Sequence, residues 1–596
     1  MRTDPNSKAN RVEPAMRQLV PPCQAKCPVG EDIQRTNLLI SLLPTDEAAA
    51  RPQLHEIGDY LYQRNPFFPV CGYVCGLCEL DCTYVHHGGA IRRRLLERFV
   101  ADACMDRLPL IAPLSPPLHQ ARVAVIGGGP AGLMAAYELS RRGYCPTVFE
   151  MSDRLGGALW LIPHYRLPAE VLTATIEALI RVAGIEVRYR APLGEGGVSL
   201  DDLRAAGSEA IFIAGGTPVP RVLSFEGAEV AGQRLVGVMY GHSFLYELGH
   251  AGIPAGYLSG RRVIVAGGGN VALDAARSAR RLGAQTTLVC LECDDPASRD
   301  GIPADPHEVQ GALEEGVEIV YSRGVQRINS TGGAFSGITA PRCLQVYDEG
   351  GFNPRFDCSD LREMNADLLI IAVGQGPERS FLNKEGLLDG QGRVAADRIT
   401  LQSVARNDVF VGGDMLRVGF LADALRDGKE AAESIDRYLR GVDVREGRHT
   451  DAVSPPPPVC QSYRPAPDAD WRPPAERLDF GLLERGFDLQ EAIAEARRCL
   501  ACGPCLACKA CLVAGIQETL PQVEVLEERC SGCGLCISAC AYGAISMRKQ
   551  GDRLVSSTDP LLCRGCGFCV AGCPAAARRL IGDDLSERMQ KAVHER

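Results

Sequence analysis

Clustered cysteines give this sequence its strongest chemical signal. Nineteen of the 26 cysteines fall into three groups, six within residues 23–82, five within 499–511 and eight within 530–573. The first residues, MRTDPNSKANRVEP, lack the apolar core of an export signal, so we expect a cytoplasmic chain. In a reducing compartment, thiols at two- and three-residue spacing predict metal or iron–sulfur ligation rather than disulfides.

The last cysteine group is an internal repeat. Residues 530–540 and 563–573 each read C-x2-C-x2-C-x3-C. Bacterial ferredoxins hold two [4Fe–4S] clusters with such runs, and the fourth cysteine of each run ligates the other cluster. Zinc is the alternative, but eight cysteines in this double spacing without histidine are not typical of zinc sites. One cluster is therefore predicted on Cys530, Cys533, Cys536 and Cys573, and the other on Cys563, Cys566, Cys569 and Cys540.

A glycine-rich turn between an apolar run and a helix-like stretch gives the next signal. The run at 122–126 is followed by GGGPAG at 127–132, whose glycines let backbone amides and a helix N-terminus approach a pyrophosphate. Glu150 ends the following strand, where a carboxylate binds ribose hydroxyls. Gly413-Asp414 leads into a helix whose start is placed to meet a flavin ribityl chain. FAD is thus predicted on Gly127, Gly129, Pro130, Ala131, Gly132, Glu150, Gly413 and Asp414.

A second unit of the same kind lies inside the first. Its glycine-rich turn follows the apolar run at 262–266, and an acidic residue ends the next strand at 292. One dinucleotide fold nested within another indicates a flavoprotein that meets a nicotinamide. The residues predicted to bind nucleotide in this unit and at the two chain crossings are Gly215, Gly267, Gly269, Asn270, Glu292 and Gly374.

The acidic residue of the second unit predicts which nicotinamide is used. The Glu292 carboxylate can accept hydrogen bonds from the adenine ribose hydroxyls of NADH, and it repels the 2′-phosphate of NADPH. Arg277, Arg280 and Arg281 are the opposing evidence, because any of them could turn toward that phosphate. We therefore expect NAD(H), with NADP(H) less favoured.

Length and composition bound the remaining possibilities. A chain of 596 residues is expected to form about three to five domains. Its 46% hydrophobic and 23% charged residues are typical of folded soluble proteins. The formal charge of −10 removes the electrostatic attraction on which nucleic-acid binding depends, and no apolar stretch is long enough for a membrane span. Neither nucleic acid nor membrane insertion is expected.

Several motifs together resemble a known family. They are RLGG at 154–157, IPHYRLP at 162–168, GGGNVALD at 267–274, PPCQAKCP at 21–28 and NPFFPVCGYVCGLCELDC at 65–82. Over residues 20–440 the chain looks like the small subunit of bacterial glutamate synthase and the N-terminal half of dihydropyrimidine dehydrogenase. The resemblance implies that a bound FAD exchanges electrons with a nicotinamide, while clusters pass single electrons to a partner. It adds Gly156, Gly157 and Arg166 to the expected FAD-binding residues.

The motifs and the resemblance predict a multidomain fold. A helical iron–sulfur domain is expected at 1–117, followed by two nested Rossmann-like α/β nucleotide-binding domains. The FAD-binding domain takes 118–240 and 365–445, and the NAD(P)-binding domain takes 241–364. A proline-rich linker at 446–475 leads to a C-terminal α+β domain at 476–596, which holds the extra cysteine group and the bacterial-type ferredoxin repeat.

The N-terminal cysteines depart from the family pattern. Relatives carry an additional C-x2-C shortly before the equivalent of Cys23, where this chain has AMRQLV at 15–20. One hypothesis shares a cluster between Cys23, Cys82 and two cysteines of the 499–511 group, with a second cluster on Cys27, Cys75, Cys78 and Glu97. The other makes residues 499–511 a self-contained cluster, and the sequence leaves both open. The candidate ligands of the group are Cys499, Cys502, Cys505, Cys508 and Cys511.

The expected function is electron transfer between NAD(H) and a protein partner through FAD and [4Fe–4S] clusters. At least three clusters are expected, with four or more favoured. No amino acid is expected to act as the catalytic group, because FAD is the redox centre. No cysteine pair follows the FAD motif within 158–167, so dithiol chemistry is not expected there. The partner would be ferredoxin or the catalytic subunit of a larger complex, such as a 2-oxoacid:acceptor oxidoreductase. The alternatives are an electron-bifurcating subunit, a glutamate synthase small subunit and a non-catalytic electron-wiring adaptor.

Overall fold

The chain forms two compact units. Unit 1 draws on residues 1–104, 447–468 and 487–596, and unit 2 on residues 105–446 and 469–486. The computed structural model describes residues 19–86, 88–194, 196–221, 227, 229–230, 233–251, 253–254, 256–448, 452–453, 465–467, 470–500, 502, 522–540, 543–551, 553–559, 563 and 568–581.

The unit boundaries differ from the domains expected from sequence. Residues 105–117, expected with the N-terminal domain, belong to unit 2, where Arg181 Nη2 donates to the backbone oxygen of Leu108 at 2.7 Å. Residues 476–486, expected with the C-terminal domain, also belong to unit 2, and the Leu483 N–H donates to Tyr165 O at 2.9 Å. These contacts join residues far apart in sequence, so composition and proline content could not reveal them.

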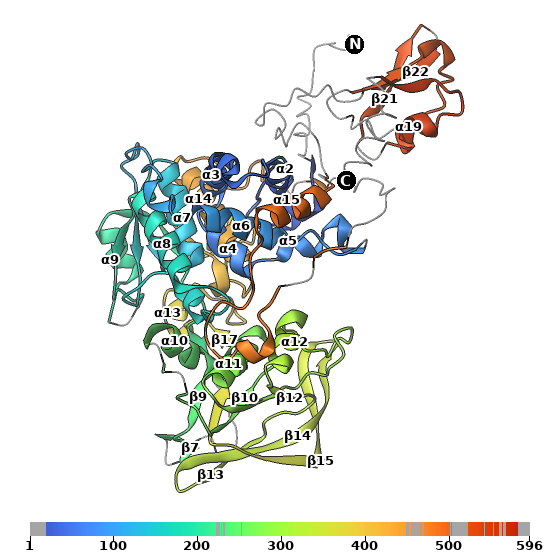
Figure 1. Ribbon diagram of the computed structural model, residues 1–596. Coiled ribbons are helices and arrows are strands. Elements are labelled where there is room, and N and C mark those ends of the chain that lie inside the picture. The colour runs from blue at the N-terminus through green and yellow to red at the C-terminus, as the bar shows by residue number, and fades with distance from the viewer. Residues whose placement is uncertain are drawn as a thin grey trace, which may run out of the picture. The chain divides into compact units, whose positions relative to one another are not determined.

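The first sheet of unit 2 is parallel and five-stranded, in the order β18-β5-β2-β3-β4, and Figure 1 labels its helices α7, α8, α9, α13 and α14. Its apolar strands are the runs expected from sequence, and β2 buries every residue after its first. Helices cover the sheet because both faces of a parallel sheet are apolar. The strands are β2 Arg122–Ile126, β3 Cys145–Phe149, β4 Glu186–Arg188, β5 Ser208–Ile213 and β18 Val409–Val411. The helices are α7 Pro130–Arg141, α8 Ala169–Ala183, α9 Leu200–Ala205, α13 Arg379–Lys384 and α14 Leu421–Leu439.

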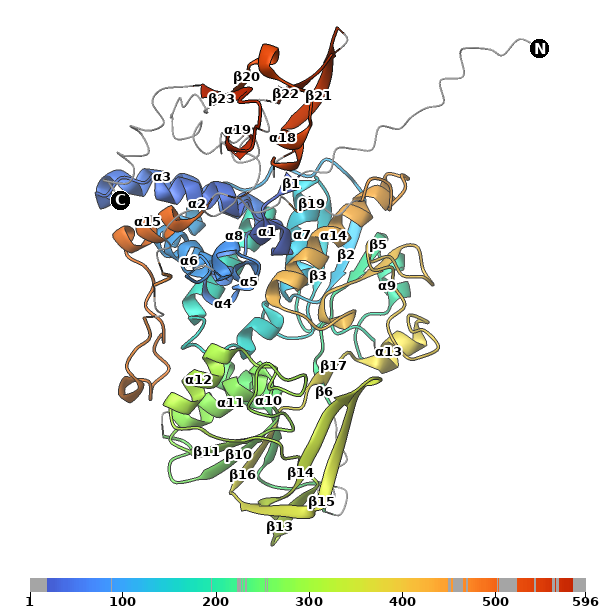
Figure 2. The ribbon, with the colours of Figure 1, turned by 90° about the vertical axis from the view of Figure 1, so that its right-hand side faces the viewer.

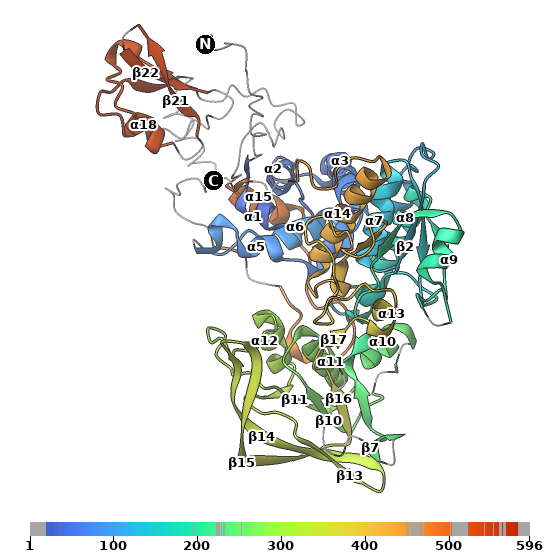
Figure 3. The ribbon, with the colours of Figure 1, turned by 180° about the vertical axis from the view of Figure 1, so that it is seen from behind.

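The second sheet of unit 2 repeats this plan in the order β12-β11-β10-β16-β9 (Figure 3). An antiparallel sheet of β13, β14 and β15 accompanies it, and the short strands β6 and β17 pair at the crossings between the two nucleotide folds. The helices are α10 Gly241–Ala251, α11 Asn270–Arg281 and α12 Pro306–Glu314. The strands are β6 Val219–Pro220, β9 Val238–Tyr240, β10 Arg262–Ala266, β11 Gln285–Val289, β12 Glu318–Val320, β13 Arg327–Thr331, β14 Ala334–Asp348, β15 Gly351–Asn365, β16 Leu368–Ile371 and β17 Gln375–Gly376.

Among its described residues, unit 1 combines helices with three two-stranded sheets, one of which pairs β1 Leu19–Val20 with β19 Ala452–Val453. The N-terminal helices are α1 Pro22–Lys26, α2 Ile33–Ser41, α3 Glu47–Arg64, α4 Phe68–Val74, α5 Leu77–Leu80 and α6 Arg93–Cys104, and α15 Leu489–Arg498 packs on α2 and α6. Near the C-terminus, β20 Gln522–Val525 pairs with β23 Arg578–Ile581 and β21 Ile545–Gln550 pairs with β22 Arg553–Thr558, with α18 Leu535–Ser538 and α19 Phe568–Ala571 beside them. In the described part of the chain, no helix is both long enough and apolar enough to span a bilayer.

Two helices that cover the first sheet, α7 and α14, pack closely against each other. α7 and α14 lie side by side (Figure 2), and Gly428 of α14 faces the backbone of α7. A Cβ on Gly428 would lie 2.5 Å from Ala131 O and 2.8 Å from Met134 Cβ. The close approach therefore requires glycine at this position, although glycine lowers helix propensity.

Replacing Gly428 with alanine tests this packing. The added methyl group must push two backbones apart, and we expect overpacking of about 1–3 kcal/mol to outweigh the roughly 1 kcal/mol gain in helix propensity. The midpoint of thermal unfolding of unit 2 should fall by several degrees. Gly390→Ala is the matched control, since a Cβ there meets nothing within 4 Å. An unchanged midpoint for Gly428→Ala would contradict the packing argument.

Candidate functional site

The turn between β2 and α7 has the geometry of a phosphate-binding cradle. Gly127 adopts φ +101°, and a Cβ there would lie 2.4 Å from Ala214 O. A Cβ on Gly132 would lie 1.9 Å from Gly127 O, so the helix can approach the turn only without side chains. Backbone N–H groups at a helix N-terminus then remain free to meet an anion.

The residues expected beside this cradle gather around it. Glu150 at the end of β3 is buried, and its Oε2 accepts the Gly128 N–H at 2.7 Å while Oε1 accepts the Ser152 N–H at 2.8 Å. The Gly156 N–H donates to Gly128 O at 2.8 Å. A Cβ on Gly157 would lie 3.0 Å from Gly129 Cα. One surface is thus formed by the turn, by Glu150 and by the glycine pair Gly156-Gly157.

The later glycine-aspartate pair meets the same helix. The Gly413 N–H donates to Asp427 Oδ2 at 2.9 Å, and a Cβ on Gly413 would lie 3.1 Å from Ala131 Cβ. Asp414 accepts the Gly419 N–H at 3.1 Å, and burial raises the pKa of its carboxyl. A Cβ on Gly215 would approach Met415 Cε to 2.8 Å. The donor set and the narrow cradle fit the diphosphate of a dinucleotide such as FAD.

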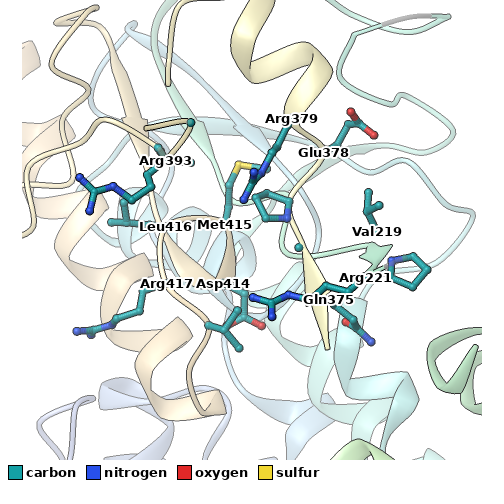
Figure 4. A pocket seen from close by; sticks show the side chains of 16 residues that line it. Val219, Arg221, Gln375, Glu378, Arg379, Arg393, Asp414, Met415, Leu416 and Arg417 are labelled. Atoms are coloured by element: carbon teal, nitrogen blue, oxygen red, sulfur yellow. The ribbon is translucent and has the colours of Figure 1, made fainter. Parts of the chain in front are cut away.

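A pocket of about 580 Å³ opens beside Asp414 (Figure 4). Its size is within the range of small-molecule sites, about 300–1,000 Å³. Apolar residues, among them Met415 and Leu416, and exposed arginines line it. Among the described residues, the side chains of Arg221, Arg379 and Arg417 have no carboxylate partner, whereas Arg393 pairs with Asp389 at 2.9 Å. Two carboxylates, Glu378 and Asp414, also line the pocket, so its four arginines leave an excess of positive charge.

The nested unit reproduces the first cradle. Gly267 adopts φ +137°, and a Cβ there would lie 2.3 Å from Ala372 O. A Cβ on Gly268 would lie 2.5 Å from Glu292 Oε2, so this carboxylate occupies the place that Glu150 takes in the first cradle. Glu292 is buried, and burial raises its pKa. Asn270 begins α11, and its Oδ1 accepts the Asp305 N–H at 3.0 Å.

The three arginines of α11 are already engaged. Arg277 Nε donates to Glu315 Oε2 at 3.0 Å and its Nη1 contacts Glu308. Arg281 Nη2 donates to Glu315 Oε1 at 2.8 Å, and Arg280 Nε donates to Glu315 O at 3.0 Å. The guanidinium groups of Arg277 and Arg281 are buried. These contacts compete with any movement toward a 2′-phosphate, which weakens the opposing evidence in the sequence.

Arg166, expected to bind FAD, contacts the nested unit. Its Nη1 donates to both Asp274 oxygens at 2.9 Å, and its Nε lies 3.1 Å from Glu308 Oε1. Its guanidinium thus joins the segment after the first cradle to α11 and α12. Asp274 stands within the GGGNVALD motif, yet sequence reasoning assigned it no role. The available signal was an acidic residue one helical turn after Asn270 in an otherwise apolar stretch, and the structure buries its carboxylate.

One predicted ferredoxin set surrounds a single cavity. Cys530, Cys533, Cys536 and Cys573 line it together with Pro574. Burial opposes ionisation of Cys530, but N–H donors from Ser556 and Gly532 outweigh it and lower the pKa of this thiol. The Ala577 N–H donates to Cys573 Sγ at 3.3 Å.

The second ferredoxin set is described in part. Cys563 and Cys569 are buried together, Cys540 packs against them and accepts the Ala544 N–H at 3.3 Å, and Cys566 lies outside the described residues. In the described part of the chain, no three His, Cys, Asp or Glu groups converge as ligands of one metal ion do. Sulfurs spaced around a cavity suit a polynuclear cluster better than zinc.

The N-terminal cysteines form two neighbouring sets that meet at Cys78, which lines the cavity of one set. Besides burial, the charges of Cys27 and Cys75 of the other set raise the pKa of the Cys78 thiol. Cys23, Cys78, Cys82, Cys499 and Cys502 line one cavity. Burial raises the pKa of Cys27 and of Cys75 to about 12, and the charges of Glu31 and Glu97 add to the effect. Cys505, Cys508 and Cys511 lie outside the described residues.

Glu97 is an unusual neighbour for these thiols. It is buried on α6, and in the described part of the structure its Oε1 has no hydrogen-bond partner. Cys71, which sequence reasoning did not propose as a ligand, is fully buried and accepts from Asn65 Nδ2 at 3.5 Å. The hypothetical ligand set of Cys27, Cys75, Cys78 and Glu97 therefore includes a carboxylate oxygen that has no hydrogen-bond partner among the described residues. Such a donor set fits a bound iron–sulfur cluster.

Known proteins share these features. The model of the pyridine nucleotide-disulphide oxidoreductase family matches residues 121–433, and that of the 4Fe-4S dicluster domain matches residues 529–577. The beta subunit of NADP(+)-dependent formate dehydrogenase from Moorella thermoacetica is 32% identical over 518 residues, which cover 81% of this chain and 70% of that protein.

Two further relatives have the same character. The small chain of glutamate synthase [NADPH] from Mycobacterium tuberculosis is 31% identical over 449 residues, covering 71% of this chain and 86% of that protein. The beta subunit of NADPH-Fe(3+) oxidoreductase from Geobacter sulfurreducens is 27% identical over 531 residues, covering 81% and 75%. The chain therefore belongs to the pyridine nucleotide-disulphide oxidoreductase family, as an FAD-dependent NAD(P)H oxidoreductase that carries a C-terminal 4Fe-4S dicluster domain.

Proposed function

We propose that this protein exchanges electrons between NADH and a protein partner, through FAD and [4Fe–4S] clusters. The observation that carries the proposal is the pair of matching cradles, at Gly127 and Gly267, built into one unit of a chain that also bears the ferredoxin cysteines. A nicotinamide delivers two electrons as hydride whereas a cluster accepts one. Bound FAD supplies the chemistry that connects the two.

The residues of this chain would bind and orient the FAD and the nicotinamide. The N–H groups of the first turn would hold a diphosphate, with Glu150 at the ribose and Asp414 at the ribityl chain. The pocket beside Asp414 would receive the flavin ring, and its arginines would favour a negatively charged ligand. In the second cradle, the Gly267 turn and Glu292 would hold the adenosine half of the nicotinamide.

Contacts between the two nucleotide folds keep the cradles in a fixed relation. Arg166 joins them through Asp274 and Glu308, and residues 470–486 add a strap over both. In this strap Arg477 Nη1 lies 2.7 Å from Glu314 of α12, while the Leu483 N–H donates to Tyr165 O. Such positioning is what hydride transfer requires, because the reacting atoms must be held in contact.

Clusters provide the exit to the partner. We assign two clusters to the eight ferredoxin cysteines, paired as the repeat predicts, and one to Cys27, Cys75, Cys78 and Glu97 in unit 1. The relatives are subunits that are named with formate dehydrogenase, glutamate synthase and Fe(3+) reduction. The partner would be a ferredoxin or the catalytic subunit of such a complex. The intact second cradle speaks against a wiring adaptor that has no use for nicotinamide.

Anaerobic mixing with NADH tests the function. NADH should bleach the flavin absorbance first, and the broad cluster absorbance should then fall as electrons reach the iron. The same experiment with NADPH and with buffer alone provides the controls. Flavin that stays oxidised with both nucleotides would refute the proposal and favour the adaptor.

Nicotinamide choice depends on Glu292. The carboxylate and a 2′-phosphate repel each other, and a tenfold preference requires only about 1.4 kcal/mol. We expect kcat/KM with a dye acceptor to favour NADH by tenfold or more, although the relatives carry NADP in their names. Glu292→Arg should reverse the preference, whereas Glu349→Arg, the same charge change at an exposed turn, should leave it alone. A wild-type protein that prefers NADPH would show that Glu292 is not the selector.

The second N-terminal site has a matched pair of cysteines for its test. Cys75→Ser should remove one cluster, about four iron atoms per chain, because it deletes a proposed ligand. Cys71→Ser should keep the full iron content, since that thiol is held by Asn65 and lies outside the proposed set. Glu97→Ala should lower the occupancy or alter the EPR signal of the same cluster. Equal iron loss in Cys71→Ser and Cys75→Ser would argue against the assignment.

A further inference from the structure

A helix from the C-terminal part of the chain is built into the N-terminal helices. α15 packs on α2 and α6 within unit 1. Its Glu495 is 2% exposed, and Oε1 accepts the Arg92 N–H at 2.7 Å. Burial of a carboxylate is costly unless it is paired, and Arg498 of the same helix supplies the charge at 2.7 Å. The contact is therefore specific.

Further hydrogen bonds hold the helix along its length. Arg498 Nη2 donates to Gly89 O at 2.8 Å, Arg497 Nε donates to Ser41 O at 3.3 Å, and Gln490 Nε2 donates to Thr45 O at 2.9 Å. Each partner lies in the N-terminal hundred residues. The end of α15 is thus fixed to that part of the fold.

The residues after α15 are consequently delivered to the N-terminal cysteines. Cys499 follows the last residue of the helix, and with Cys502 it lines the cavity that Cys23 and Cys82 also line. Donors already surround the sulfurs. Asn37 Nδ2 lies 3.5 Å from Cys499 Sγ, the Ile91 N–H lies 3.5 Å from Cys82 Sγ, and Thr83 Oγ1 lies 3.4 Å from Cys502 Sγ. Hydrogen bonds of this kind tune cluster sulfurs in ferredoxins.

We propose that Cys23, Cys82, Cys499 and Cys502 ligate a single [4Fe–4S] cluster that joins the N-terminal helices to the segment that follows α15. The inference rests on the proposed function only for the identity of the bound group. It differs from a self-contained cluster on residues 499–511, because two of those five cysteines are committed to a cavity whose other sulfurs come from the N-terminal part. The C-terminal segment thereby supplies the cysteine pair that the N-terminal segment lacks.

The shared cluster has a structural consequence. It would close the long loop between Cys82 and Cys499, and metal binding to a site that exists only in the folded state stabilises that state. α15 is the positioning element, because Glu495 and Arg498 determine where Cys499 begins.

Iron analysis of paired variants distinguishes one shared cluster from two separate ones. Cys23→Ser/Cys82→Ser and Cys499→Ser/Cys502→Ser should each lose about four iron atoms and the same EPR signal. The quadruple variant should lose no more than either double variant, because both pairs serve one group. A loss of about eight iron atoms in the quadruple variant, or full iron content in either double variant, would overturn the proposal.

A second variant tests the site with every cysteine in place. Glu495→Ala should release α15 and lower the occupancy of that same cluster, while FAD content in unit 2 stays constant and shows that the protein has folded. Glu47→Ala, which removes an exposed carboxylate from α3, should leave the iron content unchanged. Unchanged iron and EPR in Glu495→Ala would count against the role of α15.

Discussion

A chain of charged side chains fixes the orientation of one nucleotide fold relative to the other. Arg166 from the first fold contacts Asp274 and Glu308 of the second, and Arg277 continues the chain to Glu315. Asp274, Arg277 and Glu315 are buried, so removing one of them would leave an uncompensated buried charge, which typically costs about 3–5 kcal/mol. The contact is therefore directional, and it permits few relative orientations of the two folds.

An aromatic layer supports this charge chain. Tyr165 is fully buried, and the Arg281 guanidinium lies 3.7 Å from the centre of its ring. Trp471 of the strap lies 6.0 Å from the Arg277 guanidinium. Cations stacked on rings remain charged with less loss of solvation than in an aliphatic core. The strap therefore packs against both nucleotide folds, although its first residues were expected in the linker and residues 476–486 in the C-terminal domain.

The cysteine sites differ from the nucleotide cradles in that the charge of their side chains depends on protonation. A buried thiol is held neutral, as the raised pKa values of Cys27 and Cys75 show, and it ionises when a metal takes the place of its proton. Under the proposed ligation, the N-terminal sites would depend on iron for their charge balance. Cys530 differs, because backbone N–H donors already lower its pKa.

Local features were legible in the sequence. The turns at Gly127 and Gly267, the acidic residues that follow them and the ferredoxin repeat all depend on spacings of a few residues, which chain geometry converts directly into a shape. The strands β2, β3, β5, β10, β11, β16 and β18 coincide with apolar runs for the same reason. The family, the FAD cofactor and the dicluster domain could therefore be inferred from the order of the amino acids by itself.

Contacts between distant segments were decided by tertiary structure alone. The sequence suggested a cluster shared by Cys23, Cys82, Cys499 and Cys502. It could not distinguish this from a self-contained cluster on residues 499–511, because the difference depends on where α15 packs. Nor could it show that Arg277 and Arg281 are engaged by Glu315, or that Arg166 turns to Asp274. A side chain's partner is set by the burial of both groups, and burial is a property of the assembled fold rather than of any short run of residues.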